Sequence, residues 1–409
     1  MIDSQVPLLA RQPILDKHQK TVGYELLSRP VPNATPDWQD SHGDQATSEV
    51  IINAFNDLGI ENVTGGLPAF VNFTQYWLEN PPILGCKYVV AELLEHLELT
   101  DTQADHIRNL REQGFQIALD DFTGGTIPAA ILELVDIIKV DLMALDNIEQ
   151  LRDIMAANQR PGLKWLAEKV ETREEFEFCT QSGCDLFQGF FFAKPDVMYG
   201  KKIPDNKLTV LKLLRVLNNP DSEVDELTRV IQADPQISSR ILQMVNAPAF
   251  APASEITSIT RAVMTMGLDR LKSWSNMLAL GQLDDKPVAL QEQAVTRACL
   301  ARQLAELWPD MDKETAFTVG LFSLLDAFVD VPLKVLCEKL HLPAMISEAL
   351  LNNSGELGEM LNVITRLEQA DWSSLDWAAL EQRGLSSQEV SLAYYDALID
   401  ARDLISSQQ

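Results

Sequence analysis

The sequence predicts a β/α barrel in the first half of the chain, followed by an all-helical region. Short apolar runs in the first half alternate with helix-like segments, and several of these runs end on a polar or charged residue. The functional side chains of a β/α barrel collect at the carboxyl ends of its strands. This pattern therefore indicates a barrel with a site at one end. After residue 205 the apolar residues recur with the period of helices, and no strand pair is recognisable.

The most informative stretch is residues 115–125, FQIALDDFTGG, where an apolar run ends at Asp120 and Asp121. Taken alone, two aspartates before Thr-Gly-Gly are equally compatible with an ordinary turn and with a metal site. The same arrangement recurs in four other runs, which favours a site built from strand ends. These runs end at Asn72, Glu92, Lys139 and Glu168.

Residues 5–30 predict two strands joined by a turn. In TVGYELLSR, residues 21–29, side chains alternate with period two, so Glu25 is expected on the opposite face from Tyr24. A glutamate buried inside a barrel is costly unless it is paired or bound to a metal. Arg29 is a candidate for its ion-pair partner or for a phosphate clamp.

Helices are expected between the strands, and glycines mark their ends. Residues 44–60 carry an apolar stripe that Gly59 ends, and residues 106–114 form a helix closed by Gly114. Further on, the polar segment YGKKIPDNKL separates two apolar regions. We therefore place the domain boundary there, with a barrel domain over 1–203 and a helical domain over 204–409.

The helical half shows caps and stripes. Asp234 followed by Pro235 predicts an N-cap and a first helical residue. His341 is the one histidine after residue 205 and is expected at the surface or at a helix cap. Two apolar stripes are predicted: Val224, Leu227, Val230 and Ile231, and then Ile237, Ile241, Leu242 and Val245.

Length and composition limit the kind of protein. A chain of 409 residues favours two domains. Its five cysteines lack CxxC spacing, so we expect reduced thiols in a cytoplasmic protein. The sequence shows neither a secretory signal nor a long apolar span, so no membrane association is expected.

The formal net charge of −27 argues against direct nucleic-acid binding, which depends on lysine and arginine. Most of this acidity is expected to be solvated surface. An anionic ligand in an acidic pocket requires bound cations.

The first half resembles the EAL domain, a family of cyclic di-GMP phosphodiesterases, over about residues 5–200. Eight motifs occur in the family's order: QPI from Gln12, GYELLSR from Gly23, VNFT from Val71, ELLE from Glu92, DDF from Asp120, KVD from Lys139, AEKVE from Ala167 and QGFFFAKP from Gln188. The resemblance implies a TIM-like barrel.

The second half resembles an HDOD domain. ADPQISSRILQMVNAPAF begins at Ala233, and ITSITRAVMTMGLDRL begins at Ile256. HDOD domains are similar to HD hydrolases without their metal ligands. In this chain VGLFSLLDAF, from Val319, stands where a His-Asp pair would be expected. The resemblance implies a regulatory or partner-binding module without catalysis of its own.

The EAL resemblance implies that two Mg²⁺ or Mn²⁺ ions open cyclic di-GMP to linear pGpG. It implies that Asp120 bridges both ions, that Lys139 orients the attacking water and that Glu168 binds metal or accepts the proton. Metals close to Lys139 would lower its pKa. The implied metal ligands are Glu25, Asn72, Glu92, Asp120, Asp121 and Glu168. The implied substrate contacts are Gln12, Leu27, Arg29 and Gln188, and the implied supporting residues are Glu95, Asp141 and Glu171.

Several of these residues also have an ordinary interpretation. Without the resemblance, Glu95 is compatible with a carboxylate at a helix start. Lys139 is compatible with a solvated strand-end charge, and Gln188 is uninformative.

Four motifs depart from the EAL pattern: Leu26 replaces the signature alanine, DDFTGG replaces DDFGTG, Leu94 replaces a threonine and Lys169 replaces a glycine. We expect the altered loop to be harder to order and to lower the occupancy of the second metal. Cyclic di-GMP would then bind readily and turn over slowly. Exchanging Thr123→Gly and Gly124→Thr would raise turnover at limiting metal.

Two other functions stay open. One is a catalytically silent cyclic di-GMP receptor that signals through the HDOD domain, and the other is a scaffold that binds no nucleotide. A protein partner for the HDOD domain and a homodimer through the EAL domain are further expectations.

Overall fold

The computed structural model describes residues 8–29, 60–81, 88–93, 101–195, 204–247, 255–283 and 285–406. The chain divides into two compact units, one built around a barrel and one containing most of the helices after Ala193. The helix expected over 44–60 lies, apart from its last residue, outside the described part. Glu95, Leu94 and the side chain of Arg29 also lie outside it.

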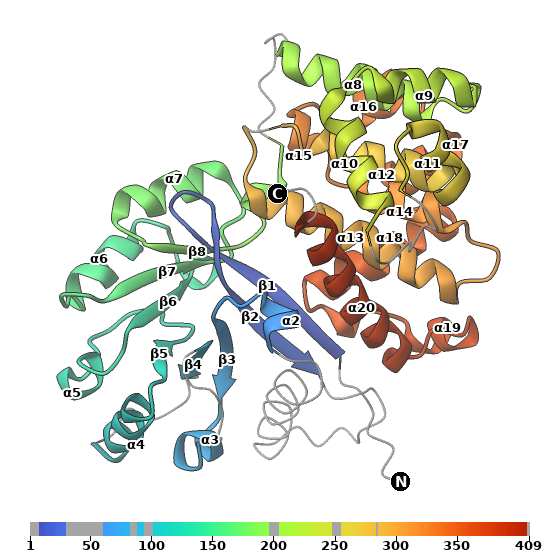
Figure 1. Cartoon of the computed structure of the whole chain (residues 1–409). Helices are drawn as coiled ribbons and strands as arrows, with labels where there is room; N and C mark the ends of the chain where they lie inside the picture. Colours follow the sequence, from blue (N-terminus) through green and yellow to red (C-terminus); the bar gives the residue numbers. More distant parts are fainter. Residues whose placement is uncertain are drawn as a thin grey trace. The chain divides into compact units, whose positions relative to one another are not determined.

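Eight strands form a closed barrel in chain order, which confirms the predicted fold (Figure 1). The first strand is antiparallel to both of its neighbours, and the other neighbouring pairs are parallel. The strands are β1 (Leu8–Asp16), β2 (Thr21–Arg29), β3 (Ala69–Phe73), β4 (Val89–Leu93), β5 (Gln116–Leu119), β6 (Ile137–Asp141), β7 (Lys164–Glu168) and β8 (Leu186–Gln188).

Helices α4 to α7 lie outside the ring of strands (Figure 1). The sequence explains where α7 begins and ends: Thr172 and Glu175 form a capping box, and Gly183 ends the helix with a φ of 104°. The helical elements of this unit are α2 (Ile60–Thr64), α3 (Gln75–Glu79), α4 (Asp101–Glu112), α5 (Ala129–Leu132), η3 (Leu142–Ala144), α6 (Gln150–Ala157), α7 (Arg173–Ser182) and η4 (Phe191–Ala193).

The barrel interior contains an apolar layer to which every strand contributes one position. On β2 this position is Gly23, where an added Cβ would lie 2.9 Å from Cε2 of Phe70, so the phenyl ring fills the space of the missing side chain. The other strands contribute buried apolar side chains, namely Ile14, Phe70, Val90, Ala118, Ile137, Leu166 and Leu186.

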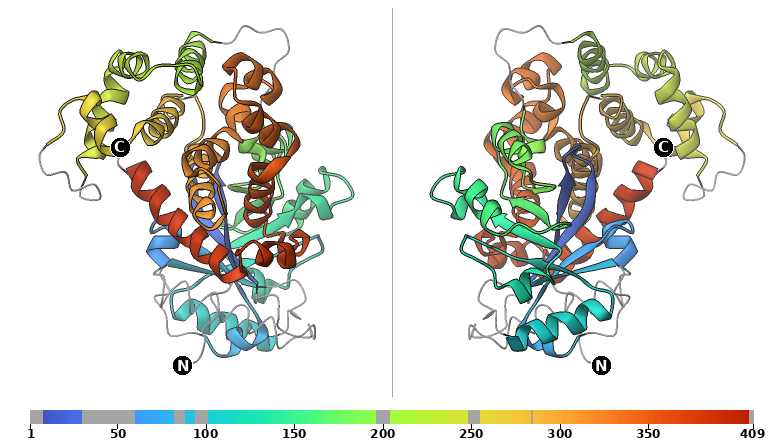
Figure 2. Two further views of the ribbon diagram at one scale, coloured as in Figure 1. Left: turned by 90° about the vertical axis from the view of Figure 1, so that its right-hand side faces the viewer. Right: turned by 90° about the vertical axis from the view of Figure 1, so that its left-hand side faces the viewer.

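The described residues from 204 onward contain helices and no strand, which confirms the predicted all-helical region (Figure 2). Its elements are α8 (Asp205–Asn218), α9 (Val224–Gln232), α10 (Pro235–Val245), α11 (Ile259–Met266), α12 (Leu268–Leu280), α13 (Val288–Leu307), α14 (Lys313–Phe322), α15 (Leu325–Val329), α16 (Leu333–Leu340), α17 (Ala344–Asn352), α18 (Gly355–Glu368), η5 (Trp372–Ser374), α19 (Trp377–Gln382) and α20 (Ser387–Ser406). Among the described helices, none is both long and apolar enough to cross a membrane.

The predicted caps of the helical region are confirmed. The carboxylate of Asp234 accepts hydrogen bonds from the backbone N–H groups of Gln236 and Ile237, with proline at the first helical position. His341 ends α16 in the left-handed conformation and is exposed. The predicted stripe on α9 is only partly correct, because Val224 is 45% exposed.

Candidate active site

A layer of polar side chains lies above the apolar layer at one end of the barrel. On each strand the polar residue is two positions from the apolar one, so both point into the barrel. Because β1 runs in the opposite direction, its polar residue precedes Ile14 instead of following it. The polar layer consists of Gln12, Glu25, Asn72, Glu92, Asp120, Lys139, Glu168 and Gln188.

Lys139 is the centre of this polar layer, and its side chain is 0% exposed. Its Nζ lies 2.6 Å from Oε1 of Glu92 and 2.7 Å from Oδ1 of Asp120. Glu168 Oε1 is 3.0 Å away, and Glu25 Oε2 is 3.8 Å away. One ammonium group therefore faces four carboxyl groups in a buried space, which leaves an excess of negative charge.

Burial and charge shift the pKa values in this layer. Burial alone lowers the pKa of Lys139, but the surrounding carboxylates outweigh it and hold the pKa well above its usual range. Burial raises the pKa of Glu92 well above its usual range, against the effect of Lys139. Burial also raises the pKa of Glu168, to about 8. Without metal the lysine is thus firmly protonated, and a lowered pKa would require cations that outweigh the carboxylates.

Asp121 extends the cluster of carboxylates. It has a φ of 47°, so the chain turns sharply at this residue directly after Asp120. Asp120, Asp121 and Glu168 each offer an oxygen atom, and these three atoms lie within 4.8 Å of one another. The predicted metal ligands at the ends of β5 and β7 are therefore close enough to share a cation.

Unpartnered oxygen atoms show that this layer fits divalent cations. Within the described part of the chain, four buried oxygens of the layer have neither a hydrogen-bond partner nor an ion pair with Lys139: Asn72 Oδ1, Glu92 Oε2, Glu168 Oε2 and Gln188 Oε1. A buried oxygen without a partner is costly. Carboxylate and amide oxygens are the ligands that Mg²⁺ and Mn²⁺ prefer, so the donor set suits the predicted metals.

The predicted substrate residues lie on β1, β2 and β8. Gln188 Nε2 donates a hydrogen bond to Gln12 Oε1 at 2.9 Å and another to Oε2 of Glu25. Leu27 lies two residues beyond Glu25 on β2 and is partly buried. Glu25 therefore has partners inside the barrel, whereas the suggested pair with Arg29 involves a side chain outside the described part.

A close backbone approach fixes the ends of β7 and β8 relative to each other. The N–H of Val170 donates to the carbonyl oxygen of Gln188 at 3.0 Å, and the N–H of Phe191 donates to that of Val170 at 3.2 Å. Between them Gly189 has a φ of 144°, and an added Cβ would lie 2.1 Å from the carbonyl oxygen of Val170. Only glycine fits there, so a larger residue would push apart the chain segments that follow Glu168 and Gln188.

Asn158 holds the loop that follows the two aspartates, a contact that the sequence did not indicate. The side chain is fully buried at the end of α6. Its Oδ1 accepts from the N–H of Ile127 at 2.9 Å, and its Nδ2 donates to the carbonyl oxygen of Gly125 at 2.9 Å. A polar residue just after a helix is too common a pattern to have indicated this contact.

The same loop limits the exchange suggested by the sequence. Gly124 has a φ of 138°, a conformation that L-residues rarely adopt. Placing threonine at position 124 would therefore strain the backbone as well as change the motif. The exchange of Thr123 and Gly124 is for this reason a poor test of loop order.

Asp141 and Lys169 form a further pair at the rim of the site. Lys169 Nζ lies 2.5 Å from Oδ2 of Asp141, whose other oxygen accepts from the N–H of Met143 at 2.8 Å. This pair gives the predicted supporting residue Asp141 a partner that sequence reasoning missed. Glu171 is exposed just before α7, and its supporting role stays a prediction.

Comparison with known proteins identifies the family. The sequence model of the EAL domain matches residues 8–195, and that of the HDOD domain matches residues 203–332. The cyclic di-GMP phosphodiesterase CdgJ of Vibrio cholerae is 31% identical over 381 residues, which cover 91% of this chain and 87% of CdgJ. The chain belongs to the EAL–HDOD family.

Two further matches have lower identity. The uncharacterized protein YuxH of Bacillus subtilis is 29% identical over 401 residues, which cover 95% of this chain and 97% of YuxH. The solved manganese and cyclic di-GMP complex of BlrP1 from Klebsiella pneumoniae matches with a TM-score of 0.37 and 21% identity. That match covers 46% of this chain and 56% of BlrP1.

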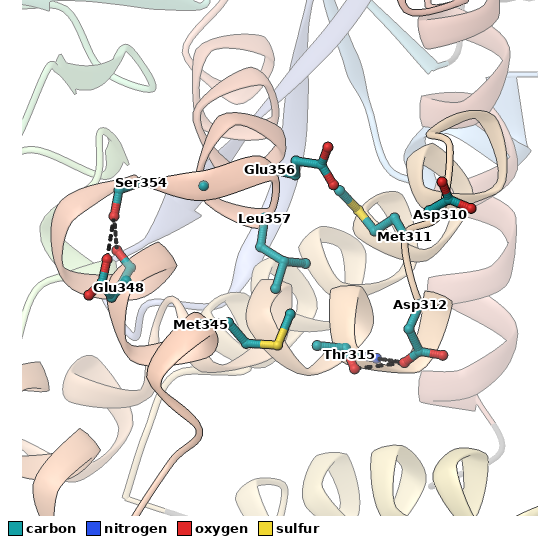
Figure 3. A pocket seen from close by; sticks show the side chains of 10 residues that line it. Asp310, Met311, Asp312, Thr315, Met345, Glu348, Ser354, Glu356 and Leu357 are labelled. Carbon is teal, nitrogen blue, oxygen red and sulfur yellow. Dashed lines mark hydrogen bonds between the residues drawn. The ribbon is translucent and has the colours of Figure 1, made fainter.

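The helical region of this EAL–HDOD protein contains a pocket (Figure 3). Its volume is about 400 Å³, and it is lined by residues between Asp310 and Leu357. Two of its carboxylates have local partners: Asp312 accepts from Thr315, and Glu348 accepts from Ser354. Of the described residues, those that cluster like metal ligands lie in the barrel.

Proposed function

We propose that this protein is a phosphodiesterase that opens cyclic di-GMP to linear pGpG with the help of two divalent cations, Mg²⁺ or Mn²⁺. Membership of the EAL–HDOD family and the similarity to CdgJ support the degradation of cyclic di-GMP. The observation that carries the proposal is the buried polar layer, with its excess of carboxylates and its unpartnered oxygens.

The metals would be held by the carboxylate and amide oxygens of this layer. Bound cations would neutralise phosphate charge and lower the pKa of a bound water. The proposed ligands are Glu25, Asn72, Glu92, Asp120, Asp121 and Glu168, with Asp120 shared between both ions.

The remaining residues of the layer would position water and substrate. Glu168 would bind metal or accept the proton from water: burial raises its pKa to about 8 without metal, and nearby cations would lower it so that the carboxylate is ionised near neutral pH. Lys139, buried and charged, would donate a hydrogen bond to that water. Gln188 and Gln12, already hydrogen-bonded to each other, would contact the nucleotide. The predicted contacts of Leu27 and Arg29 belong to the same proposal.

The test is to incubate the full chain with cyclic di-GMP and Mg²⁺ or Mn²⁺ and to measure pGpG by chromatography. Asp120→Asn should abolish turnover, because a neutral amide cannot bridge two dications, while the circular dichroism spectrum stays unchanged. Turnover of this variant at the wild-type rate would contradict the assignment. Tight binding of cyclic di-GMP without pGpG would instead support the receptor function.

For the HDOD domain we propose a regulatory or partner-binding role. Helix α8 begins at Asp205, directly after the boundary proposed at residues 203 and 204. A fragment over 204–409 should hydrolyse neither cyclic di-GMP nor phosphate monoesters. Phosphohydrolase activity in that fragment would contradict the proposal that the HDOD domain is not catalytic. The homodimer through the EAL domain stays a prediction, to be checked by light scattering.

A further inference from the structure

Lys169 occupies an unusual position directly after the proposed ligand Glu168. Its φ is 53°, in the left-handed region that is unfavourable for a residue with a side chain. Glycine would adopt this conformation without strain. The backbone therefore favours glycine at this position, and the lysine side chain is an addition at this rim of the site.

The side chain holds a positive charge next to the carboxylates. Its ammonium lies 2.5 Å from Oδ2 of Asp141, yet the lysine side chain is 58% exposed while that of Asp141 is 9% exposed. The charges of Asp121 and Glu168 contribute to raising the pKa of Lys169, after the hydrogen bond and charge of Asp141. In return, the charge of Lys169 opposes the burial that raises the pKa of Asp121.

The charge of Lys139 also lowers the pKa of Asp121, but by less than that of Lys169. Lys139 is fully buried below, where it is already surrounded by four carboxyl groups. Lys169 approaches from the β7 side and is tethered by Asp141, which is itself fixed by the N–H of Met143. A cation bound between Asp121 and Glu168 would thus lie close to a fixed ammonium group.

We propose that Lys169 is a built-in counter-ion that weakens binding of the second divalent cation, and so sets the metal concentration at which the site fills. This inference rests on the proposed metal site. Because a like charge that acts on Asp121 and Glu168 also repels a dication bound by them, removing it should tighten binding of the second ion by about tenfold at low salt. The first ion, held deeper by Glu25, Asn72 and Glu92, should be affected less.

The experiment measures Mn²⁺ binding to the full chain by calorimetry and electron paramagnetic resonance, without substrate. Lys169→Asn removes the charge and keeps a residue that tolerates a positive φ. Lys169→Arg keeps the charge and is the matched control. We expect the asparagine variant to bind the second ion about tenfold more tightly and the arginine variant to resemble the wild type. The gain should shrink at high salt, because salt screens exposed charges.

Asp141→Asn separates an electrostatic role from a structural one. It leaves the amide oxygen that Met143 needs but removes the counter-charge of Lys169, so binding of the second ion should weaken. Opposite effects of Lys169→Asn and Asp141→Asn support the inference. Weaker binding in both variants, or no change in Lys169→Asn, would overturn it. If the wild type and all variants bind no divalent ion, the proposed metal site itself is wrong.

Discussion

The same eight strands build both interior layers of the barrel, but only in the apolar layer do all the side chains have their partners within the layer. In the apolar layer, side chains such as Phe70 and Leu166 pack against one another and need nothing else. The polar layer, two residues along each strand, has four carboxyl groups around one ammonium and oxygens without partners. The apolar layer therefore stabilises the fold. The polar layer has an excess of negative charge, which a bound cation would neutralise.

One substitution in each layer of β6 gives the largest expected contrast. Lys139→Met leaves buried carboxylates without their cation and should lower the free energy of unfolding by about 3–5 kcal/mol. Because protonation or metal binding relieves that repulsion, the loss should be greatest at pH 8.5 without metal and smaller at pH 6 or with Mg²⁺. Thermal melts under these conditions provide the measurement.

Ile137→Ala is the matched control from the apolar layer. It creates a cavity and should cost about 2–5 kcal/mol, equally at each pH and metal concentration. If the loss of unfolding free energy in Lys139→Met is likewise independent of pH and metal, the distinction between the layers is wrong.

A substitution at Gly189 tests whether its close approach to Val170 keeps the polar layer in place. Gly189→Ala forces a methyl group against the carbonyl of Val170 and should cost roughly 2–3 kcal/mol, with a large loss of turnover. The control is Gly162→Ala, at a φ of 83° with no atom within 4 Å of the added Cβ. This control should cost about 1–2 kcal/mol and leave turnover unchanged. Urea unfolding and pGpG formation distinguish the two, and equal turnover would count against a positioning role for Gly189.

A substitution at Asn158 tests whether the loop after the aspartates depends on the hydrogen bonds of this side chain. Asn158→Ala leaves the N–H of Ile127 and the carbonyl of Gly125 unpaired, at a cost of about 1–3 kcal/mol. It should also raise the Mg²⁺ concentration needed for half-maximal turnover, because Asp120 and Asp121 begin this loop.

The control for Asn158 is another buried amide, Asn276, which exchanges hydrogen bonds with Asn218 in the helical region. Asn276→Ala should cost a similar free energy without changing the metal requirement. If both variants shift the metal requirement equally, general destabilisation is the cause.

Metal binding should depend on pH through Glu168. Its pKa is raised to about 8 in the folded protein, so it stays protonated between its unfolded pKa and about pH 8. Metal-free stability should therefore fall as pH rises through this range, while Mg²⁺ affinity rises by up to tenfold per unit and levels off above pH 8. Calorimetry at pH 6, 7, 8 and 9 measures both trends, and both should be weaker in Glu168→Gln, in which the raised pKa of Glu92 still contributes. A flat affinity in the wild type would contradict this role of Glu168.

Local periodicity and chain order are enough to predict part of this structure. Apolar runs that end on polar residues located the barrel strands, and Glu92, Lys139 and Glu168 lie at the strand ends, inside the barrel, as the pattern implied. The Asp234 cap is likewise specified by neighbours in the chain. These features depend on a few adjacent residues, so they are visible without a fold.

Which of these side chains come into contact depends on the tertiary structure. Closure of the barrel places Lys139 among carboxylates from four other strands or strand ends, and it makes β1 antiparallel to both neighbours. Asn158 reaches a loop more than thirty residues earlier in the chain. Lys169, just after β7, donates a hydrogen bond to Asp141 on the neighbouring strand β6. Such contacts depend on strand register and on backbone angles such as the φ of Gly189, because a side chain's partner is set by distance in space and not by distance along the chain.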